Sequence, residues 1–409
     1  MRELRTIRGV EVKGKRVLVR IDADVDLGPN GKIEPAGDHR LLGCLPIIQY
    51  LREHGARVIL LSHLGRPGGQ LVESLRLKQV GERLGQLLGV PIRALPVTVG
   101  PEAHEAVRAL TDGDVLLLEN VRFDQREEEN DPGFAHELAA LGEIYVNDAF
   151  AASHRAHASL VAITEFLPSY AGLLLTQEVH ALETVLESPE RPVVAVVSGA
   201  KLETKVGLLK NLLPRVDALL TGGGVANMFL QADGVTVGAS LVEPHLEESV
   251  RELWTQFHEN IVVPVDVRVT QTVDGAVSRV VAVDGIAPTD IVYDIGPATA
   301  HRYCTIVAAA RTCIWNGPLG KVELADFQEG TRTFATCLQK SPAYAVVGGG
   351  DTVTALRQMG LTEGFDHVSS GGGAMIAFLE GESLPGVEAL REGGTGHPPP
   401  PRLRRARRA

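Results

Sequence analysis

Residues 343–354 read Ala-Tyr-Ala-Val-Val-Gly-Gly-Gly-Asp-Thr-Val-Thr, and this stretch decides the fold class. The apolar run Tyr344–Val347 ends at three glycines, after which Asp351 and Thr352 open a helical pattern. We therefore expect a buried strand, a turn without side chains and a helix N-terminus. Backbone amides at such a terminus bind phosphate when glycine leaves them accessible. Turns of this kind also exist for packing alone, so one example does not decide between the two interpretations.

Two further glycine triplets follow the same pattern. Gly222–Gly224 come after the apolar run that starts at Ala218, and Gly371–Gly373 come after His367–Ser370. Each triplet precedes an apolar helical segment. Three triplets in corresponding places predict one surface where the backbone approaches a ligand closely.

The length and composition indicate a globular protein of two domains. The chain has 409 residues, of which 44% are hydrophobic and 22% charged, and this length exceeds one ordinary core. No apolar run is long enough to cross a bilayer and no signal peptide is recognisable, so we expect a cytoplasmic protein without a membrane partner. The net charge of −11 argues against general nucleic-acid binding. The arginine-rich tail 397–409 is either a solvated extension or a contact for an anionic partner.

The four cysteines, Cys44, Cys304, Cys313 and Cys337, are scattered and form no CxxC pair. This spacing suggests neither a zinc site nor a disulfide framework, and we expect reduced thiols.

Apolar runs alternate with helical patterns along the whole chain, which is typical of α/β proteins with parallel strands. The expected strands are Val17–Ile21, Val58–Leu61, Val115–Leu118, Ile144–Val146, Val193–Val197, Ala218–Leu220, Ile261–Val265, Ile291–Tyr293, Cys313–Trp315 and Tyr344–Val347. Between the halves, Thr176–Ser188 predicts a stiff connecting helix that ends before Pro189. Two α/β domains joined in this way would face each other across a cleft, where small ligands commonly bind.

Cationic side chains gather after the strands of the first half. They are Arg40, His63, Arg66, Arg122, Arg155 and His157. Ligands of open parallel sheets bind beyond the carboxyl ends of the strands, and the arginine fork suits phosphate and carboxylate oxygens. A single arginine would be read as a surface ion pair, but six potential cations at one edge predict a site for a small polyanion.

The second half offers charge without a nucleophile. Lys201 and Lys205 follow the strand Val193–Val197, at the edge that carries the glycine triplets. The chain contains no G-x-S-x-G elbow, H-E-x-x-H motif or Walker A loop. An anion site in one half and a phosphate site in the other suit phosphoryl transfer, which needs positioning and charge neutralisation more than covalent catalysis.

Taken together, the motifs resemble those of the phosphoglycerate kinase family. They are SHLGRP (62–67), LLENVRF (117–123), NDAF…HRAHAS (147–159), GAK…K (199–205), GGG (222–224), DIGP (294–297), WNGPLG (315–320), GGGDT (348–352), SGGGA (370–374) and LEGESLPGV (379–387). The resemblance extends from about Arg16 to Leu390. It implies a monomer of two Rossmann-like domains with a hinge: a triose-binding domain (1–175, joined by the returning segment 387–409), a connecting helix (176–188) and a nucleotide-binding domain (189–386).

The resemblance also implies the reaction, which exchanges a phosphoryl group between 1,3-bisphosphoglycerate and ADP, with Mg²⁺ and ATP/ADP, and requires domain closure. The implied triose ligands are Asp22, Asp24, Arg40, His63, Arg66, Arg122 and Arg155, with His157 in support. The implied nucleotide ligands are Lys201, Lys205, Gly222, Gly223, Gly224, Asn316, Glu323, Gly348, Gly349, Gly350, Asp351 and Thr352. Asp351 would bind Mg²⁺, and Arg40, Lys201, Gly371, Gly372 and Gly373 would act on the transferred group.

The first signature departs from the family pattern R-x-D-x-N-x-P. Here Asp24 occupies the Asn position and Asp26 the Pro position. Three interpretations of Asp24 stay open: it is protonated and donates a hydrogen bond as Asn would, it turns away and is neutralised by an arginine, or the enzyme prefers another acyl phosphate. A metal-binding carboxylate cluster is a fourth, weaker interpretation.

Smaller departures, at Ser198, Thr204 and Ser370, lie in the second half. Two other functions therefore remain open beside phosphoglycerate kinase. One is a kinase for another small carboxylate, and the other is a binding or regulatory protein that has lost turnover.

Overall fold

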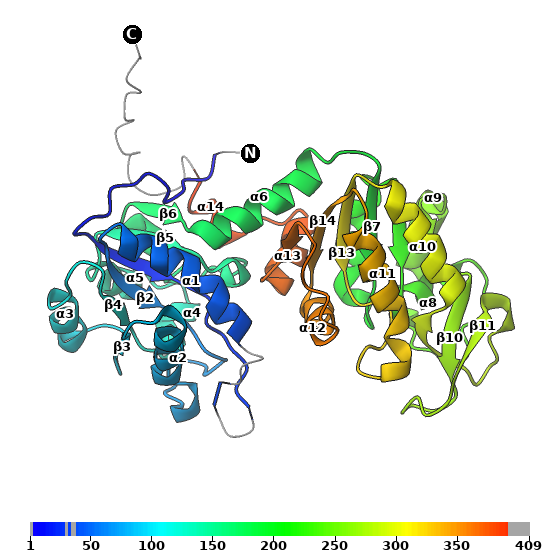
Figure 1. Ribbon diagram of the computed structural model, residues 1–409, viewed down its shortest axis with the longest axis horizontal. Coiled ribbons are helices and arrows are strands. Elements are labelled where there is room, and N and C mark those ends of the chain that lie inside the picture. The colour runs from blue at the N-terminus through cyan, green and yellow to red at the C-terminus, as the bar shows by residue number, and fades with distance from the viewer. Residues whose placement is uncertain (1–2, 29–31, 34–37, 392–409) are drawn as a thin grey trace, which may run out of the picture. The chain divides into compact units, whose positions relative to one another are not determined.

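The computed structural model describes residues 3–28, 32–33 and 38–391 (Figure 1). They form two compact units. The first comprises the described residues up to Val179 and from Ser383 onward, and the second comprises His180–Glu382. Within these residues, no helix is both long and apolar enough to span a membrane.

The first unit is a six-stranded parallel sheet with helices, in the strand order β3-β4-β2-β1-β5-β6. The elements are β1 (Arg16–Arg20), α1 (Asp38–Glu53), β2 (Arg57–Leu61), α2 (Lys78–Leu88), β3 (Arg93–Ala94), α3 (Pro101–Arg108), β4 (Val115–Leu117), α4 (Gln125–Glu128), α5 (Pro132–Ala139), β5 (Ile144–Asn147), β6 (Ser169–Ala171) and α14 (Pro385–Glu388). In β1, Val17 and Val19 pack in one core with α1 and α2, while Leu18 between them is also fully buried. Both faces of the sheet are therefore covered, and this is why its strands read as continuous apolar runs.

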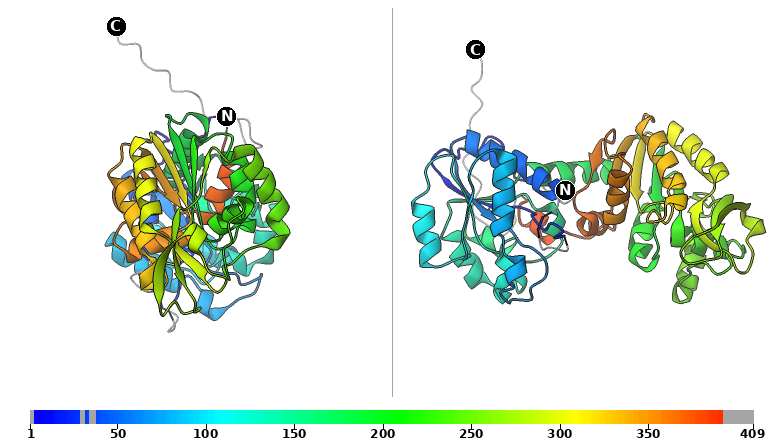
Figure 2. Two further views of the ribbon diagram at one scale, coloured as in Figure 1. Left: turned by 90° about the vertical axis from the view of Figure 1, so that its right-hand side faces the viewer. Right: turned by 60° about the horizontal axis from the view of Figure 1, so that its bottom comes forward.

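The second unit contains a second six-stranded parallel sheet, in the order β15-β14-β13-β7-β8-β9. Its elements are β7 (Val193–Val197), α7 (Val206–Leu212), β8 (Ala218–Thr221), α8 (Gly223–Ala232), α9 (Glu247–Phe257), β9 (Ile261–Val262), α10 (Pro297–Ala309), β13 (Thr312–Asn316), α11 (Glu329–Gln339), β14 (Tyr344–Gly348), α12 (Gly350–Gln358), β15 (His367–Val368) and α13 (Gly372–Leu379). Figure 2 shows α10 and α11 on one side of this sheet and α8 and α9 on the other. The predicted α/β class with parallel sheets is confirmed.

Two of the expected strands differ from the prediction. The run Ile261–Val265 is not one strand, because β9 ends at Val262 and Pro264, which has no amide to donate to a ladder, precedes β10 (Asp266–Thr270). The run Ile291–Tyr293 belongs to β12 (Ile291–Ile295), which pairs antiparallel with β10. With β11 (Ser278–Ala282), these strands form a separate antiparallel sheet in the order β11-β10-β12 that has its own small core.

The connecting helix, α6, spans Leu173–Glu187 and begins three residues earlier than the predicted Thr176–Ser188. The carboxylate of Asp148 accepts a hydrogen bond from the Leu175 amide (3.1 Å), which satisfies an otherwise unpaired donor in the first turn of the helix. The start of the helix depends on Asp148, which directly follows β5 and lies 27 residues before Leu175 in the chain, so the local sequence pattern did not reveal it.

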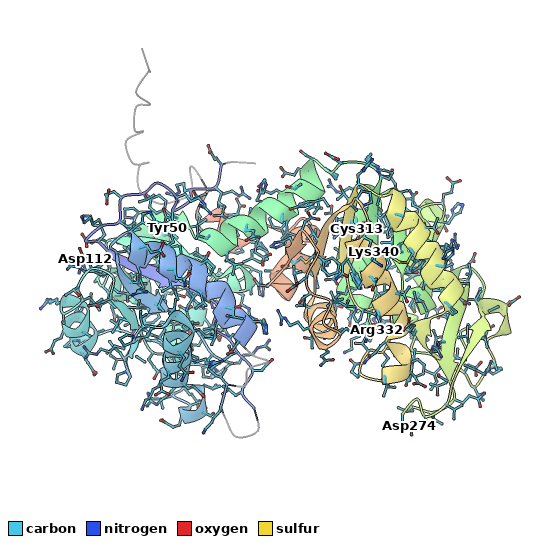
Figure 3. The ribbon with its side chains drawn as sticks, in the orientation of Figure 1. Tyr50, Asp112, Asp274, Cys313, Arg332 and Lys340 are labelled. Carbon is cyan, nitrogen blue, oxygen red and sulfur yellow. A yellow bond between two sulfur atoms is a disulfide. The ribbon has the colours of Figure 1, made fainter. Side chains whose placement is uncertain are left out.

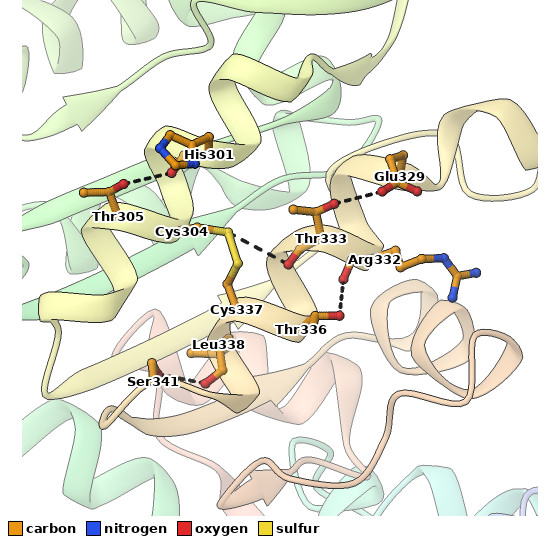
Figure 4. Close-up of a disulfide and its surroundings, with 10 residues drawn as sticks. All are labelled: His301, Cys304, Thr305, Glu329, Arg332, Thr333, Thr336, Cys337, Leu338 and Ser341. Carbon is orange, nitrogen blue, oxygen red and sulfur yellow. Dashed lines mark hydrogen bonds between the residues drawn. A yellow bond between two sulfur atoms is a disulfide. The ribbon is translucent and has the colours of Figure 1, made fainter.

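The expectation of reduced thiols is wrong for two of the four cysteines. Cys304 in α10 and Cys337 in α11 form a disulfide with a Cα–Cα distance of 5.5 Å (Figure 4). Their separation of 33 residues matches no motif, since the pairing arises from the packing of the two helices. The remaining thiols, Cys44 and Cys313, are free and buried, the latter inside β13 (Figure 3).

Candidate active site

The predicted cations of the first unit lie at the carboxyl ends of its strands. Strands β1, β2, β4 and β5 run parallel in adjacent register, so the residues that follow them share one edge of the sheet. The charges of Arg20, Arg122 and Arg155 all act on His63, which places these side chains close together. We call this cluster the anion cup; its members are Arg20, Asp22, Asp24, Arg40, His63, Arg122 and Arg155.

Arg122 is the most deeply buried of the predicted anion ligands, with 2% of its surface exposed. Its Nη1 donates to the Gly65 carbonyl (2.8 Å), and its Nε lies 3.3 Å from Glu128 Oε1. Nε and Nη2 are buried but have no hydrogen-bond partner among the described residues. Burial, together with Arg20 and Arg155, lowers the pKa of Arg122 to about 10, so it stays charged at neutral pH. Two buried donors thus lack a hydrogen-bond partner in the described part of the chain; Nε has only its ion pair with Glu128, and Nη2 is left for an anion.

His63 is held in one tautomer by Arg20. The Nη2 of Arg20 lies 3.0 Å from His63 Nδ1. A guanidinium can only donate, so Nδ1 must accept and Nε2 must carry the hydrogen. Burial, and after it the charges of Arg20 and Arg122, lower the pKa of His63 well below its usual value. His63 is therefore a neutral donor at neutral pH, and not one of the cations that the sequence analysis counted.

Arg40 forms an ion pair with the buried Asp22, through Nη1 and Oδ2. The other Asp22 oxygen accepts a hydrogen bond from the Asp24 amide (3.4 Å). Burial alone would lower the pKa of Arg40, but the nearby carboxylates, Asp22 first, outweigh it and raise this pKa. Arg40 is thus a permanent positive charge whose nearest counter-charge is Asp22.

Asp24 faces the anion cup. Its Oδ1 accepts a hydrogen bond from the Gly65 amide (2.7 Å), and its Oδ2 lies 3.7 Å from His63 Nε2. The interpretation that Asp24 turns away to an arginine is therefore wrong. Asp26, two residues on, is exposed and makes no such contact.

The structure does not bring every predicted ligand into the cluster. Arg66 is exposed and forms no hydrogen bond or ion pair with any described residue. Arg155 belongs to the cluster but is only half-buried, and its Nε donates to His154 Nε2 (3.2 Å). His157 lies beneath the cup, with its Nδ1 3.7 Å from the buried Glu127.

Sequence reasoning missed a buried network below the anion cup. Arg20 Nε donates to the Ser159 hydroxyl (2.9 Å), which donates to Glu127 Oε1 (2.6 Å), while the Ser159 amide donates to the other Glu127 oxygen (2.9 Å). Arg20 and Glu127 are both fully buried. An arginine at the end of an apolar strand was a signal for Arg20, but nothing in the local sequence marked Glu127 as its counter-charge.

In the second unit, the glycine-rich turns pack against one another in pairs. The Gly222–Gly224 turn lies against Gly199 and Ala200, and a Cβ on Gly223, whose φ is +55°, would lie 2.8 Å from the Gly199 carbonyl. The Gly371–Gly373 turn lies against Gly349 and Gly350, where a Cβ on Gly372 would lie 3.1 Å from the Gly350 amide. Glycine is therefore required at Gly223, and a Cβ at Gly372 would crowd the facing backbone. The N-termini of α8, α12 and α13 begin at these turns.

Lys205 contacts the carboxyl end of β13. Its Nζ donates to Asn316 Oδ1, and Asn316 Nδ2 donates to the Gly348 carbonyl (3.3 Å). Thr352 Oγ1 accepts a hydrogen bond from the Gly317 amide (2.8 Å). Burial lowers the pKa of Lys205, although the charge of Asp351 opposes this shift. Lys205, Asn316, Asp351 and Thr352 are thus close together, at the ends of β13 and β14.

Two predicted nucleotide ligands are not part of this cluster of contacts. Lys201 is exposed, and within the described part of the chain only its carbonyl is engaged, by the Thr204 hydroxyl (3.2 Å). Glu323 is exposed in the segment between β13 and α11 and pairs with no described residue.

Comparison with known proteins shows to which protein family the chain belongs. The family model for phosphoglycerate kinase matches residues 7–382. The chain belongs to the phosphoglycerate kinase family. It is 50% identical over 397 residues to phosphoglycerate kinase of Thermomicrobium roseum, which covers 95% of this chain and 100% of that one. It is 48% identical to the enzyme of a Roseiflexus species over 95% of this chain and 99% of the relative.

Solved structures of phosphoglycerate kinases have the same fold. The enzyme from Coxiella burnetii superposes with a TM-score of 0.86 at 39% identity, over 95% of this chain and 99% of that one. The enzyme from Pyrococcus horikoshii gives a TM-score of 0.82 at 30% identity, over 95% and 98%. The predicted family is confirmed, and the protein is a phosphotransferase. The comparisons lend no support to a kinase for another carboxylate or to a non-catalytic protein.

Proposed function

We propose that the chain transfers a phosphoryl group reversibly between 1,3-bisphosphoglycerate and ADP, which gives 3-phosphoglycerate and ATP. The observation that carries this proposal is the pair of buried donors on Arg122 that lack a hydrogen-bond partner among the described residues, in a member of the phosphoglycerate kinase family. Buried donors without partners are unfavourable unless a ligand completes their hydrogen bonds, and an anion is the ligand that a guanidinium prefers.

The anion cup holds the phosphoglycerate in this proposal. The residues that we propose to bind the phosphoglycerate are Asp22, Asp24, Arg40, His63, Arg66, Arg122 and Arg155. Arg122 and Arg155 offer charge from a partly desolvated setting, where Coulomb attraction is stronger than in bulk water. His63 contributes a neutral N–H, and the exposed Arg66 contributes a positive charge.

The nucleotide binds at the glycine-rich edge of the second unit. Its ligands are Lys201, Lys205, Gly222, Gly223, Gly224, Asn316, Glu323, Gly348, Gly349, Gly350, Asp351 and Thr352. Helix N-termini whose first residues are glycine present backbone amides to phosphate oxygens without steric hindrance. The close contact of Lys205 with Asn316 supports this assignment, since it holds the ammonium group beside the glycine-rich turns, where it can bind a phosphate oxygen.

Asp351 is the proposed ligand of Mg²⁺. It is an exposed carboxylate in the first turn of α12, and it lies close enough to Lys205 for its charge to act on the pKa of that lysine. Mg²⁺ in kinases is commonly held by one or two carboxylates together with substrate phosphates, so this single carboxylate fits. When bound, the ion would neutralise charge on the phosphate oxygens.

The reaction needs no general base. In the ATP-forming direction, a terminal phosphate oxygen of ADP forms a bond to the phosphorus of the acyl phosphate. The bond from that phosphorus to the carboxylate oxygen breaks, and the carboxylate leaves with the electron pair. Arg40, Lys201 and the amides of Gly371, Gly372 and Gly373 stabilise the charge that develops on the moving group.

The remaining assignments complete this proposal. The triose-binding domain comprises residues 1–175 and 387–409, of which 392–409 lie outside the described residues, and the nucleotide-binding domain comprises 189–386. We also propose that the protein acts as a monomer in the cytoplasm. A disulfide is uncommon in that compartment, so the redox state of Cys304 in cells is a direct check of the location.

A coupled assay of the purified protein with 3-phosphoglycerate and Mg-ATP tests the function. We expect ADP formation, a raised KM for 3-phosphoglycerate in Arg122→Ala, and a raised KM for ATP in Lys205→Ala. Arg108→Ala and Lys210→Ala are matched controls, because both side chains are exposed and lie outside the two sites. A folded wild-type protein that binds ATP but forms no ADP would refute the proposal.

A further inference from the structure

Asp24 leaves one oxygen of its carboxylate available inside the anion cup. Oδ1 is engaged by the Gly65 amide (2.7 Å), whereas Oδ2 forms no hydrogen bond with any described residue, because its 3.7 Å contact with His63 Nε2 is too long for one. The side chain is 35% exposed, so a ligand can reach Oδ2. A carboxylate oxygen in this position can accept a hydrogen bond from a ligand.

The groups that face the two oxygens of Asp24 are hydrogen-bond donors. Because Arg20 holds His63 as the Nε2–H tautomer, the ring nitrogen that lies 3.7 Å from Oδ2 carries a hydrogen. The other oxygen also faces a donor, the Gly65 amide. An ionised carboxylate only accepts, and this part of the cup attracts donors and positive charge.

An acceptor-only group is unfavourable toward most of the proposed ligand. The phosphate and carboxylate of 3-phosphoglycerate are themselves acceptors, and a second carboxylate nearby repels them. The single donor of 3-phosphoglycerate is the hydroxyl on the carbon beside its carboxylate. Asp24 therefore has one favourable partner on this ligand.

We propose that Asp24 determines specificity by accepting a hydrogen bond from the donor group beside the substrate carboxylate. This inference rests on the proposed function and narrows its substrate class to phosphorylated acids that carry a hydroxyl or an ammonium group at that carbon. Replacing the hydroxyl with an ammonium gives a ligand that can only donate there. Asp24 tolerates this replacement because it adds an opposite charge beside Oδ2.

The test compares two ligands in each variant of the full chain. Dissociation constants are measured by calorimetry for 3-phosphoglycerate and for O-phospho-D-serine, which has the ammonium in place of the hydroxyl and the same configuration. The quantity of interest is the ratio of the second constant to the first. A loss of overall structure would change both constants, whereas the loss of an acceptor changes their ratio.

In Asp24→Asn, the amide keeps an oxygen for the Gly65 amide but places an NH₂ group where Oδ2 was. We expect the ratio to rise by about tenfold or more, since an opposite charge a few ångströms from the ammonium is lost. Asp26→Asn is the matched control, because it removes the same charge from an exposed position on the same segment. In this control we expect a change of less than about twofold, because an exposed, hydrated charge is screened.

Three outcomes would overturn the inference. They are an unchanged ratio in Asp24→Asn, an equal rise in both variants, and no binding of O-phospho-D-serine to a wild-type protein that does bind 3-phosphoglycerate. Turnover of 3-phosphoglycerate with Mg-ATP separates this inference from the proposed function. Normal turnover with an unchanged ratio refutes the inference alone, whereas a wild-type protein that neither binds nor converts 3-phosphoglycerate refutes both.

Discussion

Replacing Arg40 with alanine should separate turnover from nucleotide binding. Arg40 has two roles in the proposed site: it neutralises charge on the moving phosphoryl group, and it neutralises Asp22, with which it forms an ion pair. An arginine that stabilises charge during phosphoryl transfer is worth about a thousandfold or more in rate. We therefore expect kcat to fall by about a thousandfold or more.

The same substitution uncovers the carboxylate of Asp22, whose side chain is only 8% exposed. Two unit charges about 4 Å apart interact by about 1 kcal/mol in water and by roughly 4 kcal/mol at a partly buried site. The uncovered carboxylate repels an incoming acid within these limits, so the KM for 3-phosphoglycerate should rise by about fivefold to a thousandfold. The dissociation constant of ATP should change little, because the nucleotide ligands belong to the second unit.

A double variant tests this reasoning. Adding Asp22→Asn to Arg40→Ala removes the uncovered charge and should restore most of the KM for 3-phosphoglycerate, while kcat stays low. Steady-state kinetics with both substrates and calorimetry with ATP measure these quantities. If Arg40→Ala weakens ATP binding and turnover by similar factors, or if Asp22→Asn leaves the KM unchanged, the two roles assigned to Arg40 are wrong.

Three further predictions concern stability and the nucleotide site. Cys304→Ser should lower the free energy of unfolding by roughly 3–4 kcal/mol, because the disulfide closes a loop of 33 residues; urea unfolding with and without a reductant measures this, and an equal midpoint in both would contradict it. Glu127→Gln should cost about 3–5 kcal/mol at pH 7, because it leaves the buried Arg20 without its counter-charge. Burial alone would raise the pKa of Glu127, but His157, Arg20 and Ser159 outweigh burial and lower this pKa. The contribution of Glu127 to the free energy of unfolding is therefore present above pH 4.5, the ordinary pKa, and is lost as the pH falls through the lower pKa of the folded state. The stabilities of the variant and the wild type should therefore converge in acid. Gly223→Ala should raise the dissociation constant of ADP by about tenfold or more, because a Cβ would meet the Gly199 carbonyl and shift the turn, whereas the same change at the exposed Gly285, which faces open space, should have no effect on ADP binding.

The sequence by itself determined most strands of the two parallel sheets and the edges where ligands are expected. Strands buried on both faces must be apolar throughout, so runs such as Val193–Val197 and Tyr344–Val347 stand out without any tertiary information. Parallel strands end at a common edge, so residues placed just after them, such as Arg122 and Asp351, could be assigned to that edge from their position alone. Glycines that allow close approach of backbone are visible for the same reason.

Only the tertiary structure decided which of these residues touch. The Cys304–Cys337 disulfide, the pairing of Arg20 with Glu127 through Ser159, and the antiparallel partner of β12 all join segments far apart in the chain. Local patterns report which face of an element is buried, but they do not report what packs against it. The same holds for Asp24: the sequence showed an unexpected carboxylate, and only the approach of Gly65 and His63 showed which of its oxygens is left for a ligand.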